Sequence, residues 1–316
     1  MRKANEIWTL EQINSVYIQP FNDLLHQSHC LHREYHHPNI MQTATLLSIK
    51  TGACPENCGY CSQSGHYKTA VQKDRLMDVA TVIEKARAAK AAGASRFCMG
   101  AAWRSLPEKA MPQLQAMITE VKALGLETCT TLGMLTCEQA RALKSAGLDY
   151  YNHNIDTSPS YYANVVTTRK FSERLETIKN VRQAGINVCC GGILGLGETR
   201  EDRIEFLMTL VTMDPPPESV PINRLIPVAG TPMESVKQID GLEIVRTIAT
   251  ARIIMPRSAI RLTAGRCDMS DELQALCFFA GANSIFIGDK LLTEENPQHA
   301  KDNQLFAKLG ISAALP

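Results

Sequence analysis

The chain reads ATLLSIKTGACPENCGYC over residues 44–61. Its first seven residues form a largely apolar, strand-like run, and the loop after them holds Cys54, Cys58 and Cys61 in the spacing C-x3-C-x2-C. Three thiolates can hold three irons of a four-iron cluster and leave the fourth iron open to a reactant, whereas a fully ligated cluster mainly carries electrons. A structural zinc site is the alternative, but zinc prefers four closed ligands in two close pairs, and only His66 follows nearby. The spacing therefore favours a cluster with an open iron.

Strand-like and helix-like segments alternate along the chain. Short apolar runs predict eight strands, over residues 44–50, 95–99, 127–131, 150–155, 186–192, 219–226, 258–263 and 283–287. Apolar residues three and four apart predict helices between them, over residues 79–92, 108–124, 137–146, 171–184, 201–213, 242–255 and 271–280. Eight strands alternating with helices predict an α/β fold, a closed (β/α)8 TIM-type barrel, with the functional groups at the carboxyl ends of the strands. The three-cysteine loop follows the first predicted strand and therefore lies at that end.

The barrel is expected to span residues 44–288, after an N-terminal helical extension over 1–43 and before a C-terminal loop and helix over 289–316. The chain has 316 residues, of which 45% are hydrophobic, and a net charge of +1. Such a balance does not favour nucleic acid or an anionic membrane as a partner. No run approaches the ~18 apolar residues of a membrane span, and the N-terminus does not resemble a secretory signal. Eleven cysteines, an odd number, suggest reduced thiols in the cytoplasm.

A second set of cysteines lies on predicted strands. Cys98, Cys129 and Cys189 fall on the second, third and fifth strands, and side chains alternate along a strand, so each can point into the barrel. Cys190 would then point the opposite way. Arg261 lies in an apolar run of the seventh strand, and a buried charge needs a partner. Cysteine is also a common core residue, so these residues alone leave a second metal site and ordinary core packing equally open.

Six segments together carry a resemblance to a known family. They are residues 54–61 (CPENCGYC), 98–103 (CMGAAW), 150–157 (YYNHNIDT), 191–199 (GGILGLGET), 219–223 (SVPIN) and 261–266 (RLTAGR). The first is the signature of the radical S-adenosylmethionine (SAM) superfamily, and with the others the chain resembles the biotin synthase family within it. The resemblance runs over most of the chain. It agrees with the barrel and with the open iron already inferred.

This resemblance implies the chemistry of the loop. Cys54, Cys58 and Cys61 would hold a [4Fe-4S] cluster whose open iron binds SAM. One electron would then split SAM into methionine and a 5′-deoxyadenosyl radical, which takes hydrogen from an unactivated carbon. The cofactor supplies this hard step, and the protein supplies orientation and exclusion.

The resemblance also implies a second cluster inside the barrel. This [2Fe-2S] cluster would donate the sulfur that converts dethiobiotin to biotin, and its ligands would be Cys98, Cys129, Cys189 and Arg261. Arginine is an unusual ligand because its guanidinium is normally protonated and has no lone pair to give. We expect Arg261 to count with the loop cysteines among the catalytic residues.

Further residues are expected to contact SAM or the substrate. By the same resemblance they are Tyr60, Ala101, Asn154, Asp156, Arg174, Ile193 and Asn223. Asn154 would bind a ureido group or a ribose, Asp156 the ribose hydroxyls, Arg174 the methionyl carboxylate and Asn223 the ureido ring. Tyr60 would pack beside the cluster or the adenine. Each polar residue taken alone also suits a strand-end or helix-start cap, and Tyr60 also suits space filling.

Some positions depart from the family pattern. Relatives often carry two threonines near the substrate carboxylate, where this chain has Thr293 and Glu294, and an inward-facing acid there would repel that carboxylate. The remaining cysteines are expected to be core or surface thiols, namely Cys30, Cys137, Cys190, Cys267 and Cys277. Five histidines are expected to lie on a solvated helix face rather than bind a metal, namely His26, His29, His32, His36 and His37.

Two other functions stay open on the residues alone. One is a different radical SAM enzyme, such as a mutase or a maturase, which would keep the loop cysteines but need not have the second set. The other is a non-catalytic iron–sulfur protein. The family resemblance implies a flavodoxin- or ferredoxin-type electron donor, iron–sulfur assembly machinery and a second copy of the chain as partners, and neither nucleic acid nor a membrane.

Overall fold

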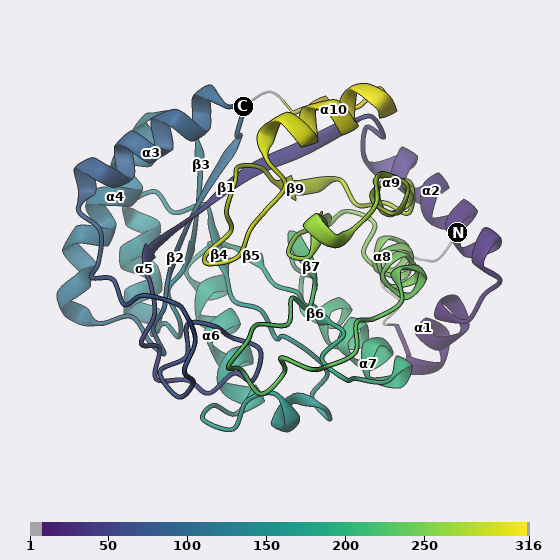
Figure 1. Ribbon diagram of the computed structural model, residues 1–316, viewed down its shortest axis with the longest axis horizontal. Coiled ribbons are helices and arrows are strands. Elements are labelled where there is room, and N and C mark those ends of the chain that lie inside the picture. Colours follow the sequence, from purple (N-terminus) through teal and green to yellow (C-terminus); the bar gives the residue numbers. More distant parts are fainter. Residues whose placement is uncertain (1–7, 315–316) are drawn as a thin grey trace.

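The computed structural model describes residues 8–314, so residues 1–7 of the expected N-terminal extension and residues 315–316 lie outside the description. Eight parallel strands form a closed barrel, and the first, β1, pairs with both β2 and β9 (Figure 1). The strands of the barrel, in order, are β1 (Ile40–Lys50), β2 (Arg96–Ala101), β3 (Glu127–Thr131), β4 (Tyr150–Asn152), β5 (Asn187–Cys189), β7 (Ser219–Arg224), β8 (Ala259–Leu262) and β9 (Ser284–Phe286). The predicted fold class is confirmed.

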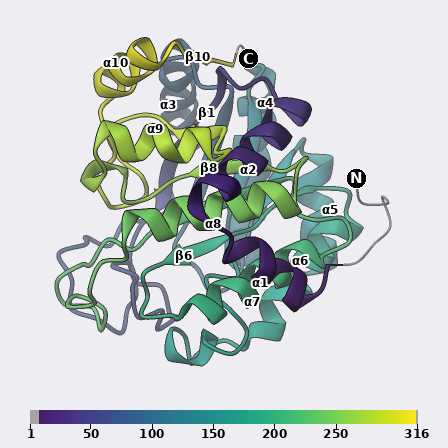
Figure 2. The ribbon, with the colours of Figure 1, turned by 90° about the vertical axis from the view of Figure 1, so that its right-hand side faces the viewer.

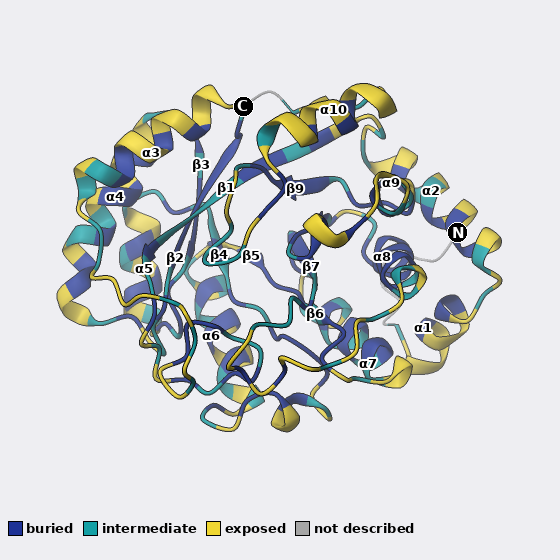
Figure 3. Ribbon diagram, in the orientation of Figure 1, coloured by how far each residue is buried: buried dark blue, intermediate teal, exposed yellow. Residues whose placement is uncertain are grey.

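Helices surround the barrel and bury one face each against it (Figures 1 and 3). They are α3 (Val79–Ala91), α4 (Met111–Ala123), α5 (Cys137–Ser145), α6 (Phe171–Gln183), α7 (Arg200–Val211), α8 (Gly241–Ile254) and α9 (Asp271–Phe279). Side-chain oxygens of Asp78, Thr136, Thr199 and Ser270 cap four of them by accepting a backbone N–H of the first turn. Short 3-10 turns lie at Glu108–Ala110, Tyr162–Asn164 and Arg266–Asp268. Among the described residues, no helix is long and apolar enough to cross a membrane.

Elements outside the barrel cover one side of it. Helices α1 (Leu10–Tyr17) and α2 (Phe21–Tyr35) lie across α8, as Figure 2 shows. After β9, α10 (His299–Leu309) is followed by the two-residue strand β10 (Ser312–Ala313), which pairs with the start of β1. The chain thus returns to its first strand.

The fourth and fifth strands differ from the prediction. They end at Asn152 and Cys189, and a separate strand, β6 (Gly192–Leu194), pairs with β7. Gly191 lies at this break, where a Cβ atom would stand 1.9 Å from the carbonyl oxygen of Pro221. Only a bare backbone allows this close approach, which accounts for a glycine at the break between β5 and β6.

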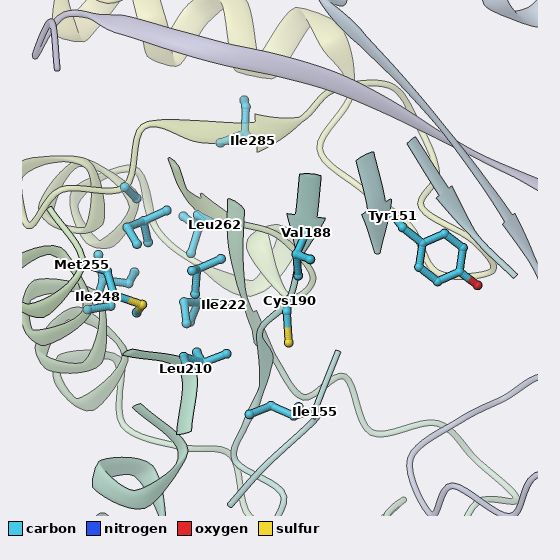
Figure 4. Packing of buried hydrophobic residues seen from close by; sticks show 14 of the residues in the cluster. Tyr151, Ile155, Val188, Cys190, Leu210, Ile222, Ile248, Met255, Leu262 and Ile285 are labelled. Atoms are coloured by element: carbon cyan, nitrogen blue, oxygen red, sulfur yellow. The ribbon is translucent and has the colours of Figure 1, made fainter. Parts of the chain in front are cut away.

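The outward side of the strands forms the main hydrophobic core. Figure 4 shows Val188, Cys190 and Ile222 in one cluster of buried hydrophobic residues that also contains Ile248 of α8 and Leu210 of α7. Cys190 is fully buried in this cluster. Neighbouring Cys189 points the other way, as the alternation of side chains requires.

One expectation for α2 is wrong. His32 is only 2% exposed, and His36 Nε2 lies 2.9 Å from the carbonyl oxygen of Pro256 and 2.7 Å from Nη1 of buried Arg252. Burial lowers the pKa of His32 to about 3 and that of His36 to about 4. These two histidines therefore belong to the packed face of the helix, whereas His26 and His37 are exposed.

Candidate active site

A cavity of about 330 Å³ opens at the carboxyl ends of the strands. Its wall includes the loop cysteines Cys54, Cys58 and Cys61, and also Cys189 and Arg261 from the strands. All of the residues expected to contact SAM or substrate line it as well, namely Tyr60, Ala101, Asn154, Asp156, Arg174, Ile193 and Asn223. One cavity therefore touches residues from both cysteine sets.

The three-cysteine loop folds back on itself directly after β1. Gly52 and Ala53 have φ angles of 70° and 51°, in the left-handed region, which reverses the chain before Cys54. The amide of Cys54 donates to the carbonyl of Gln63 at 2.9 Å, so the start and the end of the loop lie together. Burial raises the pKa of the thiols in this loop, that of Cys61 to about 11.

A buried acid inside the loop ties it to distant segments. Glu56, 3% exposed, accepts from Nη1 of Arg104 at 2.9 Å and from Nη2 of Arg169 at 3.0 Å, and also from the hydroxyl of Thr168. Burial alone raises the pKa of Glu56, but the Thr168 hydrogen bond and the charge of Arg169 outweigh it and hold the pKa below its usual value. Sequence reasoning missed this clamp, although an acid between two cluster ligands was visible.

Arg174 and Asp156 form a buried ion pair on the cavity wall. Arg174 Nη2 lies 2.5 Å from Asp156 Oδ2, while its Nη1 donates to the carbonyl of Asn154 at 2.7 Å and its Nε to the hydroxyl of Tyr162 at 2.6 Å. Asp156 has a φ of 66°, and its carbonyl accepts from the amide of Ile193 at 2.8 Å. The pair fixes the strained end of the β4 segment, so Arg174 is already engaged before any ligand binds.

Two asparagines link backbone segments at the rim of the cavity through their side-chain amides. Asn154 Oδ1 accepts from the amide of Gly191 at 3.1 Å, and its Nδ2 has no partner among residues 8–314. Asn223 Nδ2 donates to the carbonyl of Gly192 at 2.9 Å, and its Oδ1 accepts from Thr263 at 2.5 Å. Asn154 therefore retains donors for a ligand, while Asn223 acts first as a link between β7 and the β6 segment.

The second cysteine set lies inside the barrel. Cys98 pairs in register with Cys129, and Cys189 pairs with Asn152 and Ser219. The three thiols are 3%, 1% and 1% exposed. A hydrogen bond between Cys98 and Cys129 lowers the pKa of Cys98, with help from nearby cations, and raises that of Cys129. Parallel register alone brings these side chains together, as the alternation predicted.

Arg261 completes this layer from the opposite side of the barrel. Its guanidinium is 1% exposed, donates from Nε to Ser284 Oγ at 2.8 Å and from Nη2 to Gln42 Oε1 at 3.3 Å, and lies over the ring of Phe286 at 4.8 Å. The side chain is thus anchored through two nitrogens and lines the cavity.

Comparison with known proteins agrees with this geometry. The profile of the radical SAM superfamily matches residues 48–210, and that of the Biotin and Thiamin Synthesis associated domain matches residues 221–312. A biotin synthase of Legionella pneumophila (strain Corby) is 72% identical over 312 residues, 99% of each chain. Biotin synthase 2 of Paracoccus denitrificans (strain Pd 1222) is 60% identical over 301 residues, 95% of this chain and 94% of that relative. The chain belongs to the biotin synthase family.

Solved structures of other proteins share the fold. The FeFe-hydrogenase maturase HydG from Carboxydothermus hydrogenoformans has a TM-score of 0.82 at 16% identity and covers 98% of this chain and 76% of that one. Methylornithine synthase (PylB) has a TM-score of 0.80 at 17% identity, over 98% and 95% of the two chains. At these identities the likeness shows the barrel architecture alone.

Membership of the biotin synthase family settles the class of protein. The chain is a radical SAM enzyme of sulfur insertion, and its cofactors are SAM, a [4Fe-4S] cluster and a [2Fe-2S] cluster. A non-catalytic iron–sulfur protein, the alternative from another class, is set aside, and so are a mutase and a maturase.

The donor atoms fit these cofactors. In residues 8–314, no three His, Cys, Asp or Glu side chains converge as the ligands of a single metal ion do. The thiolates of an iron–sulfur cluster bind different irons and need not converge in this way. Inside the barrel, Ser219 Oγ and Arg96 Nη1 are buried without a hydrogen-bond partner among the described residues. Buried polar groups usually have a partner, so these two suit a site that holds a cofactor.

Glu294 faces the cavity in this member of the biotin synthase family. It lies on the segment after β9, lines the cavity wall, and its Oε1 accepts from Ser62 Oγ at 3.1 Å and from Thr293 Oγ1 at 3.0 Å. Neither partner carries a positive charge. The acid is therefore inward-facing, the arrangement in which it would oppose a substrate carboxylate.

Proposed function

We propose that the chain converts dethiobiotin to biotin in the cavity between its two cysteine sets. The observation that carries the proposal is that one cavity wall contains Cys54, Cys58 and Cys61 from the loop and Cys189 and Arg261 from the strands. A substrate held there would have a radical source on one side and a sulfur source on the other. Holding reactants in this geometry is the main contribution that a protein makes to cofactor chemistry.

The residues divide the work as follows. Cys54, Cys58 and Cys61 would hold the [4Fe-4S] cluster. The ligands of the [2Fe-2S] cluster would be Cys98, Cys129, Cys189 and Arg261. When bound, these groups and SAM supply the electron, the 5′-deoxyadenosyl radical and the sulfur. The chain itself binds and orients SAM and the substrate, and it excludes water from them.

The side chains of the rim would orient SAM and the substrate. Asn154 has a free amide donor for a ribose or ureido oxygen, and Ile193 and Ala101 offer apolar wall. Arg174 is held by Asp156, so we assign this pair to the ribose and methionyl end of SAM as a preformed unit. Tyr60 would close the side of the cavity that holds the adenine of SAM. Asn223 would close the side that holds the ureido ring of the substrate.

The partners follow from the same chemistry. A flavodoxin- or ferredoxin-type protein would supply electrons, and iron–sulfur assembly machinery would load the clusters. We further propose that the chain works in the cytoplasm as a homodimer. Size measurement by light scattering on the oxygen-protected protein tests the last point, since a single monomeric species would contradict it.

The function is tested with the anaerobically reconstituted protein, a chemical reductant, SAM and dethiobiotin. We expect methionine and 5′-deoxyadenosine, followed by biotin. Cys189→Ala should stop biotin formation and keep SAM cleavage, whereas its matched control Cys190→Ala should keep both, because Cys190 lies in the outer hydrophobic core. Equal loss of biotin in both variants would contradict the assigned ligand set. An Arg261→Ala variant that makes biotin at the normal rate would show that this ligand is dispensable.

A further inference from the structure

Arg96 is a buried cation in the barrel interior to which no role has yet been given. It is the first residue of β2 and is 1% exposed. Its Nε and Nη2 lie 3.0 and 2.9 Å from Glu127 Oε2, and its guanidinium lies 3.5 Å from the ring centre of Tyr150. The third nitrogen, Nη1, is buried and has no hydrogen-bond partner in residues 8–314.

Register places this guanidinium directly below the inner cysteines. Arg96 pairs with Glu127, and two residues further along the same strands Cys98 pairs with Cys129. Residues two apart on a strand share a face, so Arg96 and Cys98 both point into the barrel. Tyr150, on which Arg96 stacks, is in register with Cys129. The unpartnered N–H therefore lies in the layer next to the thiols.

The contacts that hold Arg96 in place do not explain Nη1. The ion pair uses Nε and Nη2, and the stacking uses the face of the guanidinium. A buried charged donor without an acceptor is costly, and such groups in native proteins usually bind something. Thiolate and sulfide sulfur are acceptors with negative charge, and a charge-assisted hydrogen bond to them is stronger than a neutral one.

We propose that Arg96 is a positioning residue for the [2Fe-2S] cluster, and that its Nη1–H donates a hydrogen bond to a sulfur atom of the bound cluster. The inference rests on the proposed ligand set of Cys98, Cys129, Cys189 and Arg261. With Arg261 on the other side, Arg96 gives the cluster a second fixed cation. Hydrogen bonds and charge at the sulfurs are the means by which a protein tunes the potential and lifetime of such a cluster.

The test uses full-length reconstituted protein and readouts of the cluster rather than of turnover. Arg96→Met removes the charge and the donor but keeps a long side chain. We expect its [2Fe-2S] cluster to have a more negative reduction potential, because a nearby cation favours the reduced form, and to be lost to an iron chelator about tenfold faster. Potentiometric titration, followed by visible absorption, measures the reduction potential. The time course of iron removal by the chelator measures the rate of cluster loss. The [4Fe-4S] cluster should keep its spectrum.

Two further variants separate this role from packing. Glu127→Gln removes the ion pair and leaves Nη1 in place, so potential and chelation rate should stay close to those of the unaltered protein. Arg96→Lys keeps the charge with a simpler donor, so it should restore the potential and partly restore the lifetime. If Arg96→Met does not fold, the comparison of Arg96→Lys with Glu127→Gln still decides, since the proposal requires faster chelation in the lysine variant alone.

Unchanged potential and lifetime in Arg96→Met, or equal changes in Glu127→Gln, would overturn the role of Arg96. Cys129→Ala run in parallel tells this failure from a failure of the ligand set. A Cys129→Ala protein that keeps a complete [2Fe-2S] cluster overturns both. Loss of the cluster in Cys129→Ala beside an unaltered Arg96→Met overturns the Arg96 inference alone.

Discussion

The two cysteine sets are held in place by different means. Loop cysteines such as Cys58 follow a turn in the left-handed region. Side chains from distant segments hold this loop in place, above all Arg104 and Arg169, which form ion pairs with Glu56. The strand cysteines, such as Cys129, are fixed by the hydrogen-bonded register of the barrel itself. A loop site therefore needs its own tertiary contacts, whereas a strand site is as rigid as the fold.

The largest effect should separate the chemistry of the two sets. Cys58→Ala removes a ligand of the cluster that cleaves SAM, so 5′-deoxyadenosine and biotin should both fall to background. Cys129→Ala removes a ligand of the sulfur source only, so 5′-deoxyadenosine should still form while biotin does not. Chromatography of both products from one reaction measures this. Parallel loss of SAM cleavage in both variants would show that the sets do not act separately.

The second prediction tests the clamp. Glu56→Gln leaves buried Arg169 without its acid, and removing one partner of a buried ion pair costs about 3–5 kcal/mol. Asp271→Asn is the matched change at an exposed ion pair, where Lys308 and Asp271 are 65% and 50% exposed and the loss should be about 1 kcal/mol or less. Urea unfolding of the two cluster-free proteins gives both values. Equal losses would mean that the loop is held by something other than Glu56.

A third prediction concerns the stability of the folded protein at acidic pH. The pKa of Glu56 is lowered in the folded state, so its contribution to stability is present above the usual value near 4.5 and is lost as the pH falls below it. His32 reduces stability at a higher pH than Glu56 does. Its pKa is about 3 in the folded state, so protonation favours the unfolded chain once the pH drops below 6.5.

Unfolding free energies measured from pH 7.5 to 3.5 should therefore fall in two windows. Glu56→Gln should reduce the fall below pH 4.5, and His32→Phe should reduce the fall that begins below pH 6.5, to which His36, with its pKa of about 4, also contributes. A single transition that neither variant alters would contradict the assignment of both windows. The loop clamp, unlike the strand register, is thus expected to be sensitive to acid.

Sequence reasoning predicted what depends on period and spacing. The alternation of strands and helices gave the barrel, and the period of two placed Cys98, Cys129 and Cys189 inside it. The break after Cys189 was missed, because it arises from the approach of Gly191 to a neighbouring strand rather than from a local signal.

Tertiary partners were not predictable in the same way. The Glu56 clamp joins residues more than 45 positions apart, and the unpartnered nitrogen of Arg96 is defined by what does not contact it. His32 was placed on a solvated face, yet it is buried on a helix that packs against α8. Pairings of this kind depend on three-dimensional packing that a single sequence does not contain.

The smallest expected effect is at Glu294, which lines the cavity beside the cysteine loop. Its carboxylate faces the cavity with only hydroxyl partners, so Glu294→Thr should remove about 1 kcal/mol of repulsion from a bound carboxylate. The KM for dethiobiotin should then fall about fivefold with kcat unchanged. Glu295→Thr is the matched control, because this neighbouring acid is exposed and does not line the cavity. The methyl ester of dethiobiotin, which has no charge to repel, should gain nothing from Glu294→Thr. An equal gain for acid and ester would show that size rather than charge at this position limits binding.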